Sequence, residues 1–179
     1  MLRNAGISFE VRPTDIPEIP NPMESPREFA ERMAQEKAMA AFRAHPEDFV
    51  LGADTVVVID GQILGKPRDT SDGERMLRML SGRTHLVITG VCLIGPQSTP
   101  REPGFVDVQS ETTLVYVQSI SDDDICFYLG TGEPMDKAGA YGIQGIASRW
   151  ISRIEGDYPN VVGLPVGLVY RMLQQHEAI

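Results

Sequence analysis

A long apolar run interrupted by one acid constrains the fold of this chain more than any other feature. Residues 49–59 are nearly continuous apolar and β-branched sequence, which is typical of a strand buried on both faces. Gly52, Ala53, Asp54 and Thr55 interrupt this run, and an unpaired carboxylate in such a place is energetically costly. Asp54 is therefore expected to meet a cation, a metal ion or hydrogen-bond donors, or to face a cleft.

Strand patterns and helix patterns alternate along the rest of the chain. This alternation favours an α/β fold, and a long hairpin between residues 85 and 118 makes the expected sheet mixed. The predicted strands are 7–12, 49–59, 62–64, 85–94, 106–118 and 146–154, and the predicted helices are 26–44, 125–129, 163–175 and one capped at Ser71 or Asp72.

The composition excludes several classes of protein. The formal net charge of -9 repels nucleic-acid backbones, so a nucleic-acid polymer is not an expected partner. No apolar run approaches the roughly 18 residues that a membrane helix needs. The two cysteines, Cys92 and Cys126, form no CxxC pair. We therefore expect a soluble, cytoplasmic single domain with reduced cysteines and no membrane partner.

Three charged residues could carry chemistry, but each has a structural alternative. Asp54 could equally be a strand-end aspartate that caps a neighbouring turn. Lys66 follows a glycine and precedes a proline, which suits an ammonium aimed at a phosphate, although a solvated turn lysine is the simpler interpretation. Lys37 is most simply an exposed helix charge paired with an acid one turn away.

The most informative stretch is the polar, glycine-rich segment Gly132–Gly145. Its glycines permit positive φ and close approach of a ligand, and its charged and amide side chains can ligate a metal, contact a phosphate or bind a base edge. The alternative is a structured loop packed on Tyr141. The sequence contains no GxxxxGK[ST], GxGxxG or GxSxG motif and no zinc-type histidine spacing.

Five ordered segments carry a resemblance to a known family: Gly52–Val57, Leu64–Pro67, Leu80–Val91, Gly132–Gly145 and Gly156–Pro165. Together they resemble the Maf family of nucleoside triphosphate pyrophosphatases over essentially the whole chain. The part of the loop from Asp136 to Gly145 is similar to the branch that acts on dTTP and UTP, rather than to the 7-methyl-GTP branch.

The resemblance implies a curved mixed sheet flanked by helices, with two lobes around a nucleotide cleft, similar to the inosine triphosphate pyrophosphatases. It implies hydrolysis of dTTP and UTP to the monophosphate and pyrophosphate with Mg²⁺ or Mn²⁺, which removes non-standard or surplus nucleotides. Asp54 matches the proton acceptor that activates water for attack on the α-phosphorus, and a metal-ligand role is equally compatible. By the same resemblance, Thr55 and Gln144 select the base, Lys66, Lys137 and Lys37 bind the triphosphate, and Glu18 joins Asp54 as a metal ligand.

The family pattern also includes a strand and a Ser-x-Ser-Pro-Arg-Arg segment that do not precede Met1. We therefore expect a single Maf-like domain over residues 1–179, either truncated at its amino terminus or, as the favoured explanation, given a misplaced start. Loss of that segment would remove arginines for the triphosphate, so a second hypothesis is a nucleotide-binding regulator linked to septum formation, with little or no turnover. A homodimer is left open.

Overall fold

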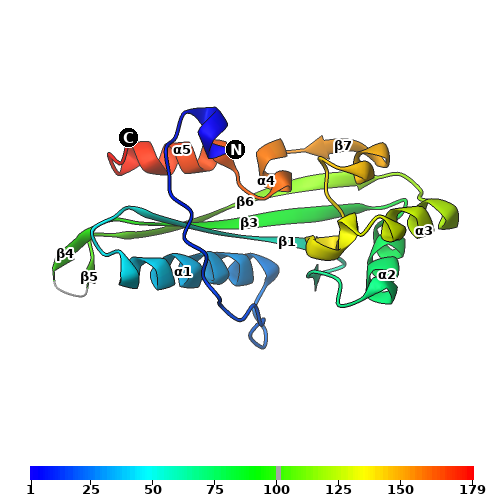
Figure 1. Cartoon of the computed structure of the whole chain (residues 1–179), viewed down its shortest axis with the longest axis horizontal. Helices are drawn as coiled ribbons and strands as arrows, with labels where there is room; N and C mark the ends of the chain where they lie inside the picture. The colour runs from blue at the N-terminus through cyan, green and yellow to red at the C-terminus, as the bar shows by residue number, and fades with distance from the viewer. Residues whose placement is uncertain (100–101) are drawn as a thin grey trace. The chain divides into compact units, whose positions relative to one another are not determined.

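The computed structural model describes residues 1–99 and 102–179 (Figure 1). The chain divides into two compact units: unit 1 comprises Met1–Asp54, Thr89–Glu111 and Gly163–Ile179, and unit 2 comprises Thr55–Ile88 and Thr112–Val162. The strands are β1 (Val50–Ile59), β2 (Gln62–Leu64), β3 (Thr84–Ile94), β4 (Gln97–Thr99), β5 (Glu102–Pro103), β6 (Val106–Val117) and β7 (Ile151–Glu155). The α-helices are α1 (Pro26–Ala44), α2 (Thr70–Leu80), α3 (Asp122–Gly130), α4 (Tyr158–Val162) and α5 (Val166–Gln175). The 3₁₀ turns are η1 (Leu2–Ala5), η2 (Glu133–Asp136), η3 (Ala138–Ala140) and η4 (Ile146–Arg149).

Five strands form one sheet in the order β2-β1-β3-β6-β7, which confirms the α/β class. The expectation of a mixed sheet is wrong, because the five strands are antiparallel. Along the chain, β1 leads from unit 1 into unit 2, β3 returns, and β6 enters unit 2 again. Asp60 (φ 52°) and Gly61 (φ 74°) make the tight turn of the β1/β2 hairpin, as their sequence predicts.

In unit 1, α1 and α5 cover opposite faces of the strands (Figure 1). Cys92 and Ile94 of β3 pack with α1, whereas Val91 and Leu93 pack with α5. Consecutive side chains of a strand point to opposite faces, so this alternation places one helix on each face. These two small apolar clusters of unit 1 therefore lie on opposite faces of its strands.

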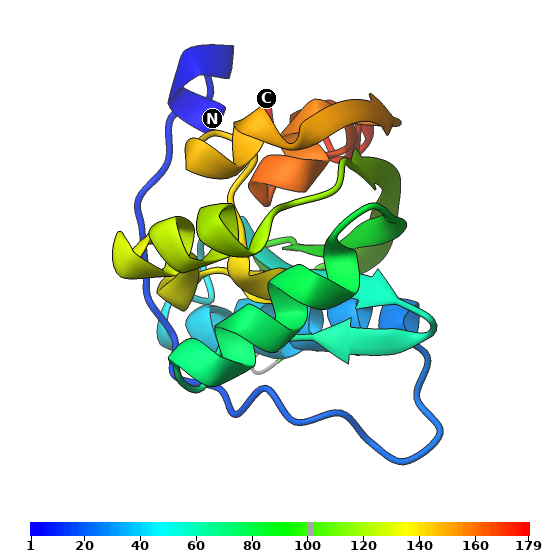
Figure 2. The ribbon, with the colours of Figure 1, turned by 90° about the vertical axis from the view of Figure 1, so that its right-hand side faces the viewer.

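Unit 2 has a single larger core. Val57, Val87 and Val115 from three strands pack with Leu77 of α2 and Tyr128 of α3. The two helices lie side by side (Figure 2). Within residues 1–99 and 102–179, no helix combines the length and the hydrophobicity needed to cross a membrane.

Helix starts follow local sequence signals, with one correction. Ser25 and Glu28 form the predicted capping box of α1. The N-cap of α2 is Asp69, not Ser71 or Asp72, because the Asp69 carboxylate accepts a hydrogen bond from the backbone N–H of Asp72 at 2.8 Å. The Asp72 side chain instead binds two arginines.

Two predicted strands are wrong in whole or in part. Residues 7–21 are all described and form neither helix nor strand, so the expected strand at 7–12 is absent from this part of the chain. A half-buried strand needs a paired neighbour, and alternating polarity alone does not supply one. The expected strand at 146–154 begins instead as η4 and continues as β7.

Candidate active site

Asp54 lies on the face of β1 that α1 covers, because its side chain shares a face with Gly52 two residues earlier. A Cβ atom at Gly52 would lie 2.3 Å from the carbonyl oxygen of Ala34, and one at Gly90 of β3 would lie 2.3 Å from that of Ala30. Only glycine permits this approach of helix backbone to strand backbone. The two glycines therefore allow α1 to lie directly against the strands beside Asp54.

Lys37 of α1 bridges two carboxylates. Its Nζ donates to Asp54 Oδ1 at 2.5 Å and to Glu18 Oε1 at 2.7 Å. Asp54 is buried, with 8% of its surface exposed. Its carboxylate is in direct contact with the positively charged ammonium of Lys37. Burial by itself would lower the pKa of Lys37, but the hydrogen bonds to Asp54 and Glu18 outweigh it, and the pKa is raised.

This arrangement decides between the alternatives for Asp54 and Lys37. The partners of Lys37 lie 17 and 19 positions away in the sequence, so the pairing with an acid one turn away is wrong. Asp54 lies inside β1 and pairs with a helix lysine, so it is not a turn-capping residue at a strand end. The structure brings Glu18, Lys37 and Asp54 together.

The donor chemistry of this cluster fits a hard divalent cation. Asp54 and Glu18 offer carboxylate oxygens that already share one cation, the Lys37 ammonium. Mg²⁺ is commonly held by one or two carboxylates, with waters and substrate phosphates completing its shell. A separate group of three potential ligands in the described ranges, His45, Glu47 and Asp48, does not include Asp54.

In unit 2, Glu133 holds the glycine-rich segment in shape. Its Oε1 accepts from Tyr128 Oη at 3.0 Å and from the backbone N–H of Ile146 at 3.1 Å. A Cβ atom at Gly145 would lie 1.9 Å from the same oxygen. The carboxylate therefore fills the space that a side chain at Gly145 would need. Burial is the main reason that the pKa of Tyr128 is raised.

The two predicted phosphate lysines of unit 2 belong to neighbouring turns. Lys137 donates to Asp136 Oδ1 at 2.6 Å and to the Glu133 carbonyl oxygen at 3.1 Å. The backbone N–H of Gly139 donates to the Gly65 carbonyl oxygen at 3.0 Å, which ties the segment to the turn that carries the exposed Lys66. The pKa of Asp136 is lowered, chiefly by its hydrogen bond from Lys137, with a smaller contribution from Lys66.

The two predicted base-selecting residues lie in different settings, one in a turn region and one within a strand. Gln144 lies between η3 and η4 with an exposed side chain. Thr55 follows Asp54 on β1, so strand geometry points its side chain to the face opposite Asp54. Their role in base selection stays a prediction.

The alternative interpretation of the glycine-rich segment is correct for its middle. Tyr141 is buried in the core of unit 2, and its hydroxyl lies 2.8 Å from His85 Nε2. Burial lowers the pKa of His85 to about 4. The segment is thus anchored by one tyrosine, while Asp136 and Gln144 on either side of it are exposed.

Sequence reasoning missed Tyr128 and the structural use of Glu133. No motif marks Tyr128, since in the sequence it resembles any other core aromatic residue. The strand glycines Gly52 and Gly90 were the available signal for a close backbone approach.

Comparison with known proteins agrees with this geometry. A family model described as "Maf-like protein" matches residues 1–176. The dTTP/UTP pyrophosphatase of Koribacter versatilis is 53% identical over 175 residues, covering 98% of this chain and 87% of that protein. The dTTP/UTP pyrophosphatases of Syntrophomonas wolfei (47% identical, 97% of this chain, 89% of that protein) and Geobacter sulfurreducens (44% identical, 100% and 91%) are also similar. The chain belongs to the family of Maf-like proteins.

Proposed function

We propose that this chain is a dTTP/UTP pyrophosphatase. The observation that carries the proposal is the contact of Lys37 with Asp54 and Glu18, in a chain 53% identical to a protein of that name. In the reaction, a water oxygen bonds to the α-phosphorus and the bond from that phosphorus to the bridging oxygen breaks. The products are the nucleoside monophosphate and pyrophosphate.

Asp54 is the proposed proton acceptor. The ion pair with Lys37 favours the ionised carboxylate, which is the form that can take a proton from the attacking water. Its position inside a buried strand holds the oxygen atoms in one place. Glu18 and Asp54 would together hold a divalent cation. The chemistry that a bound Mg²⁺ or Mn²⁺ supplies is neutralisation of phosphate charge and a lowered pKa of a bound water.

Substrate binding is assigned to four residues of unit 2. Lys66 and Lys137 offset the charge of the triphosphate, and Gln144 and Thr55 select the uracil or thymine base. The exposed Lys66 and the half-buried Lys137 on two linked turns, together with the exposed amide of Gln144, support this assignment. We further propose that residues 1–179 act as one Maf-like domain, with a curved sheet and a nucleotide cleft similar to that of inosine triphosphate pyrophosphatases.

The test is pyrophosphate release from dTTP, UTP, CTP and 7-methyl-GTP with Mg²⁺. We expect release from dTTP and UTP, and a loss of about a hundredfold or more in Asp54→Asn, as for removal of a general base. Asp123→Asn, which neutralises an exposed acid of α3, is the matched control and should keep full activity. The proposal is rejected if the folded wild-type protein releases pyrophosphate from dTTP and UTP no faster than Asp54→Asn does. Calorimetric binding without turnover would then favour a regulatory role.

A further inference from the structure

Apolar burial holds the part of the chain around Glu18 only weakly. Residues 7–21 contain no helix or strand, as the structure describes them. Ile7 packs against the core at the start of this stretch, but Val11 is 74% exposed and Ile19 is 69% exposed, so these two side chains gain little from burial. An acid on such a segment needs another restraint if it is to meet Lys37.

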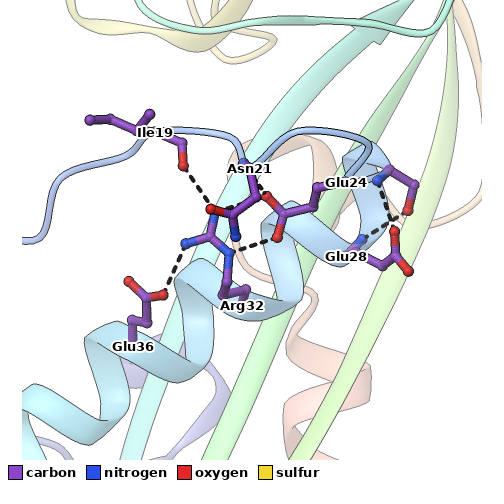
Figure 3. A network of polar contacts seen from close by, with 7 residues as sticks. Ile19, Asn21, Glu24, Glu28, Arg32 and Glu36 are labelled. Atoms are coloured by element: carbon purple, nitrogen blue, oxygen red, sulfur yellow. Dashed lines mark hydrogen bonds and ion pairs between the residues drawn. The ribbon is translucent and has the colours of Figure 1, made fainter.

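Arg32 of α1 supplies a fork of hydrogen bonds to this segment (Figure 3). Its Nε and Nη2 donate to the two carboxylate oxygens of Glu24 at 2.6 and 2.8 Å. Nη2 also donates to the carbonyl oxygen of Ile19 at 2.9 Å, and Nη1 donates to Glu36 Oε1 at 2.9 Å. One side chain therefore ties both Ile19 and Glu24 to the helix that carries Lys37.

The Glu24 end of the fork is itself ordered. Its carboxylate accepts from the backbone N–H of Asn21 at 2.9 Å, and its side chain is only 9% exposed. The hydrogen bond from Arg32 is the main reason that the pKa of Glu24 is lowered to about 2. Residues 19–24 are thus closed into a loop whose two ends meet on Arg32.

Ile19 directly follows Glu18, so fixing the Ile19 carbonyl limits where the Glu18 backbone can lie. Glu18 is half exposed and contacts Lys37 at 2.7 Å. A lysine at position 32 would keep the positive charge but could not form the planar fork that engages the Ile19 carbonyl and Glu24 together. The planar geometry of the guanidinium, more than its charge, therefore allows Arg32 to bind Ile19 and Glu24 at the same time.

We infer that Arg32 is a positioning residue that holds Glu18 beside Asp54 and thereby sets the affinity of the site for a divalent cation. This inference rests on the proposed function, because it takes Glu18 as a metal ligand. Partners outside the ligand shell commonly change metal affinity by about 10–100-fold. The effect should fall on metal binding and leave the chemistry at saturating metal nearly intact.

The experiment measures Mn²⁺ binding by calorimetry without nucleotide, together with hydrogen exchange of the backbone amides of residues 18–24. Arg32→Lys and Glu24→Gln should each raise the Kd for Mn²⁺ by about tenfold or more and speed exchange in this segment. Glu36→Gln removes an Arg32 contact without touching the segment, so it should change the Kd by less than about twofold. Glu18→Gln should raise the Kd at least as much as Arg32→Lys.

Three results would each overturn the inference. Arg32→Lys could bind Mn²⁺ with the affinity of the wild type, it could leave hydrogen exchange at residues 18–24 unchanged, or the unmutated protein could fail to bind Mn²⁺. Failure of the proposed function looks different, since the protein would then bind Mn²⁺ without hydrolysing dTTP or UTP. In an active enzyme, Arg32→Lys should raise the Mg²⁺ concentration for half-maximal rate, with kcat at saturating Mg²⁺ within about threefold of wild type, because the reacting groups are untouched.

Discussion

The two units hold their polar residues in place by different physical means. In unit 1, Asp54 and Lys37 lie on a strand and a helix pressed together at Gly52, and Glu18 is brought to them by the Arg32 fork. In unit 2, Lys137 belongs to a segment that folds on itself through short turns and the Glu133 carboxylate. Unit 1 relies on backbone contact between a helix and a strand, and unit 2 on hydrogen bonds made within and to a segment of short turns.

This difference separates what substitutions should do in each unit. A change at the helix–strand contact of unit 1 moves backbone, and backbone cannot be repacked cheaply. A change at a side-chain hydrogen bond of unit 2 costs the bond and the desolvation of its partner. Among substitutions, the largest losses of stability are therefore expected in unit 1.

Gly52→Ala attacks the backbone contact of unit 1. The added Cβ would lie 2.3 Å from the Ala34 carbonyl oxygen, so α1 must move away from β1. We expect a loss of about 3 kcal/mol in the free energy of unfolding, measured by urea denaturation, as for severe overpacking. Gly130→Ala is the control, since no atom lies within 4 Å of the corresponding Cβ. Equal stabilities of the two variants would contradict a backbone contact.

Acidification tests the anchor of unit 2. The pKa of His85 is lowered by burial from 6.5 to about 4, so its stabilising contribution is complete above pH 6.5 and is lost as the pH falls to about 4. This residue should account for a loss of about 3 kcal/mol between those values. Urea unfolding followed by the fluorescence of the single tryptophan, Trp150, measures it. His85→Gln should flatten the pH dependence; an unchanged slope would show that His85 does not titrate this way.

Tyr128→Phe removes one donor from Glu133 and one acceptor from the Gly142 N–H. We expect a loss of about 1–2 kcal/mol, because both groups are partly buried. Tyr116→Phe removes a comparable tyrosine–glutamate bond, of 2.7 Å to Glu155, at an exposed site and should cost less than about 0.5 kcal/mol. Similar losses of unfolding free energy in the two variants would contradict the expectation that the partly buried Tyr128 bond stabilises the protein more than the exposed Tyr116 bond.

Much of the fold could be predicted because its signals are local. The capping box at Ser25 and Glu28 and the Asp60-Gly61 turn act within a few residues, so the sequence shows them directly. The strand predicted at 7–12 failed because pairing depends on a distant neighbour that periodicity does not reveal. The cap of α2 was misplaced for a simpler reason, since four candidate N-cap residues follow one another from Asp69 to Asp72.

The candidate site was predictable to a smaller extent. The cost of burying Asp54 required a partner, and the structure supplies Lys37. The residue types around Lys37 favoured a surface pairing, and only family resemblance placed it near Asp54. The role of Arg32 could not be predicted, because its partners Ile19 and Glu24 lie outside helices and strands. The sequence of such a stretch has no periodic pattern that indicates its position.

The division of the chain also bears on folding during synthesis. The cluster that contains Leu2 and Val91 is completed by Leu168 and Val169 of α5, so unit 1 cannot close its core until residues 163–179 have left the ribosome. Unit 2 needs nothing beyond Val162, so its core can assemble first. Until then the face of β3 that carries Val91 and Leu93 lacks the helix that covers it, whereas α1 can already pack on Cys92 and Ile94 of the other face.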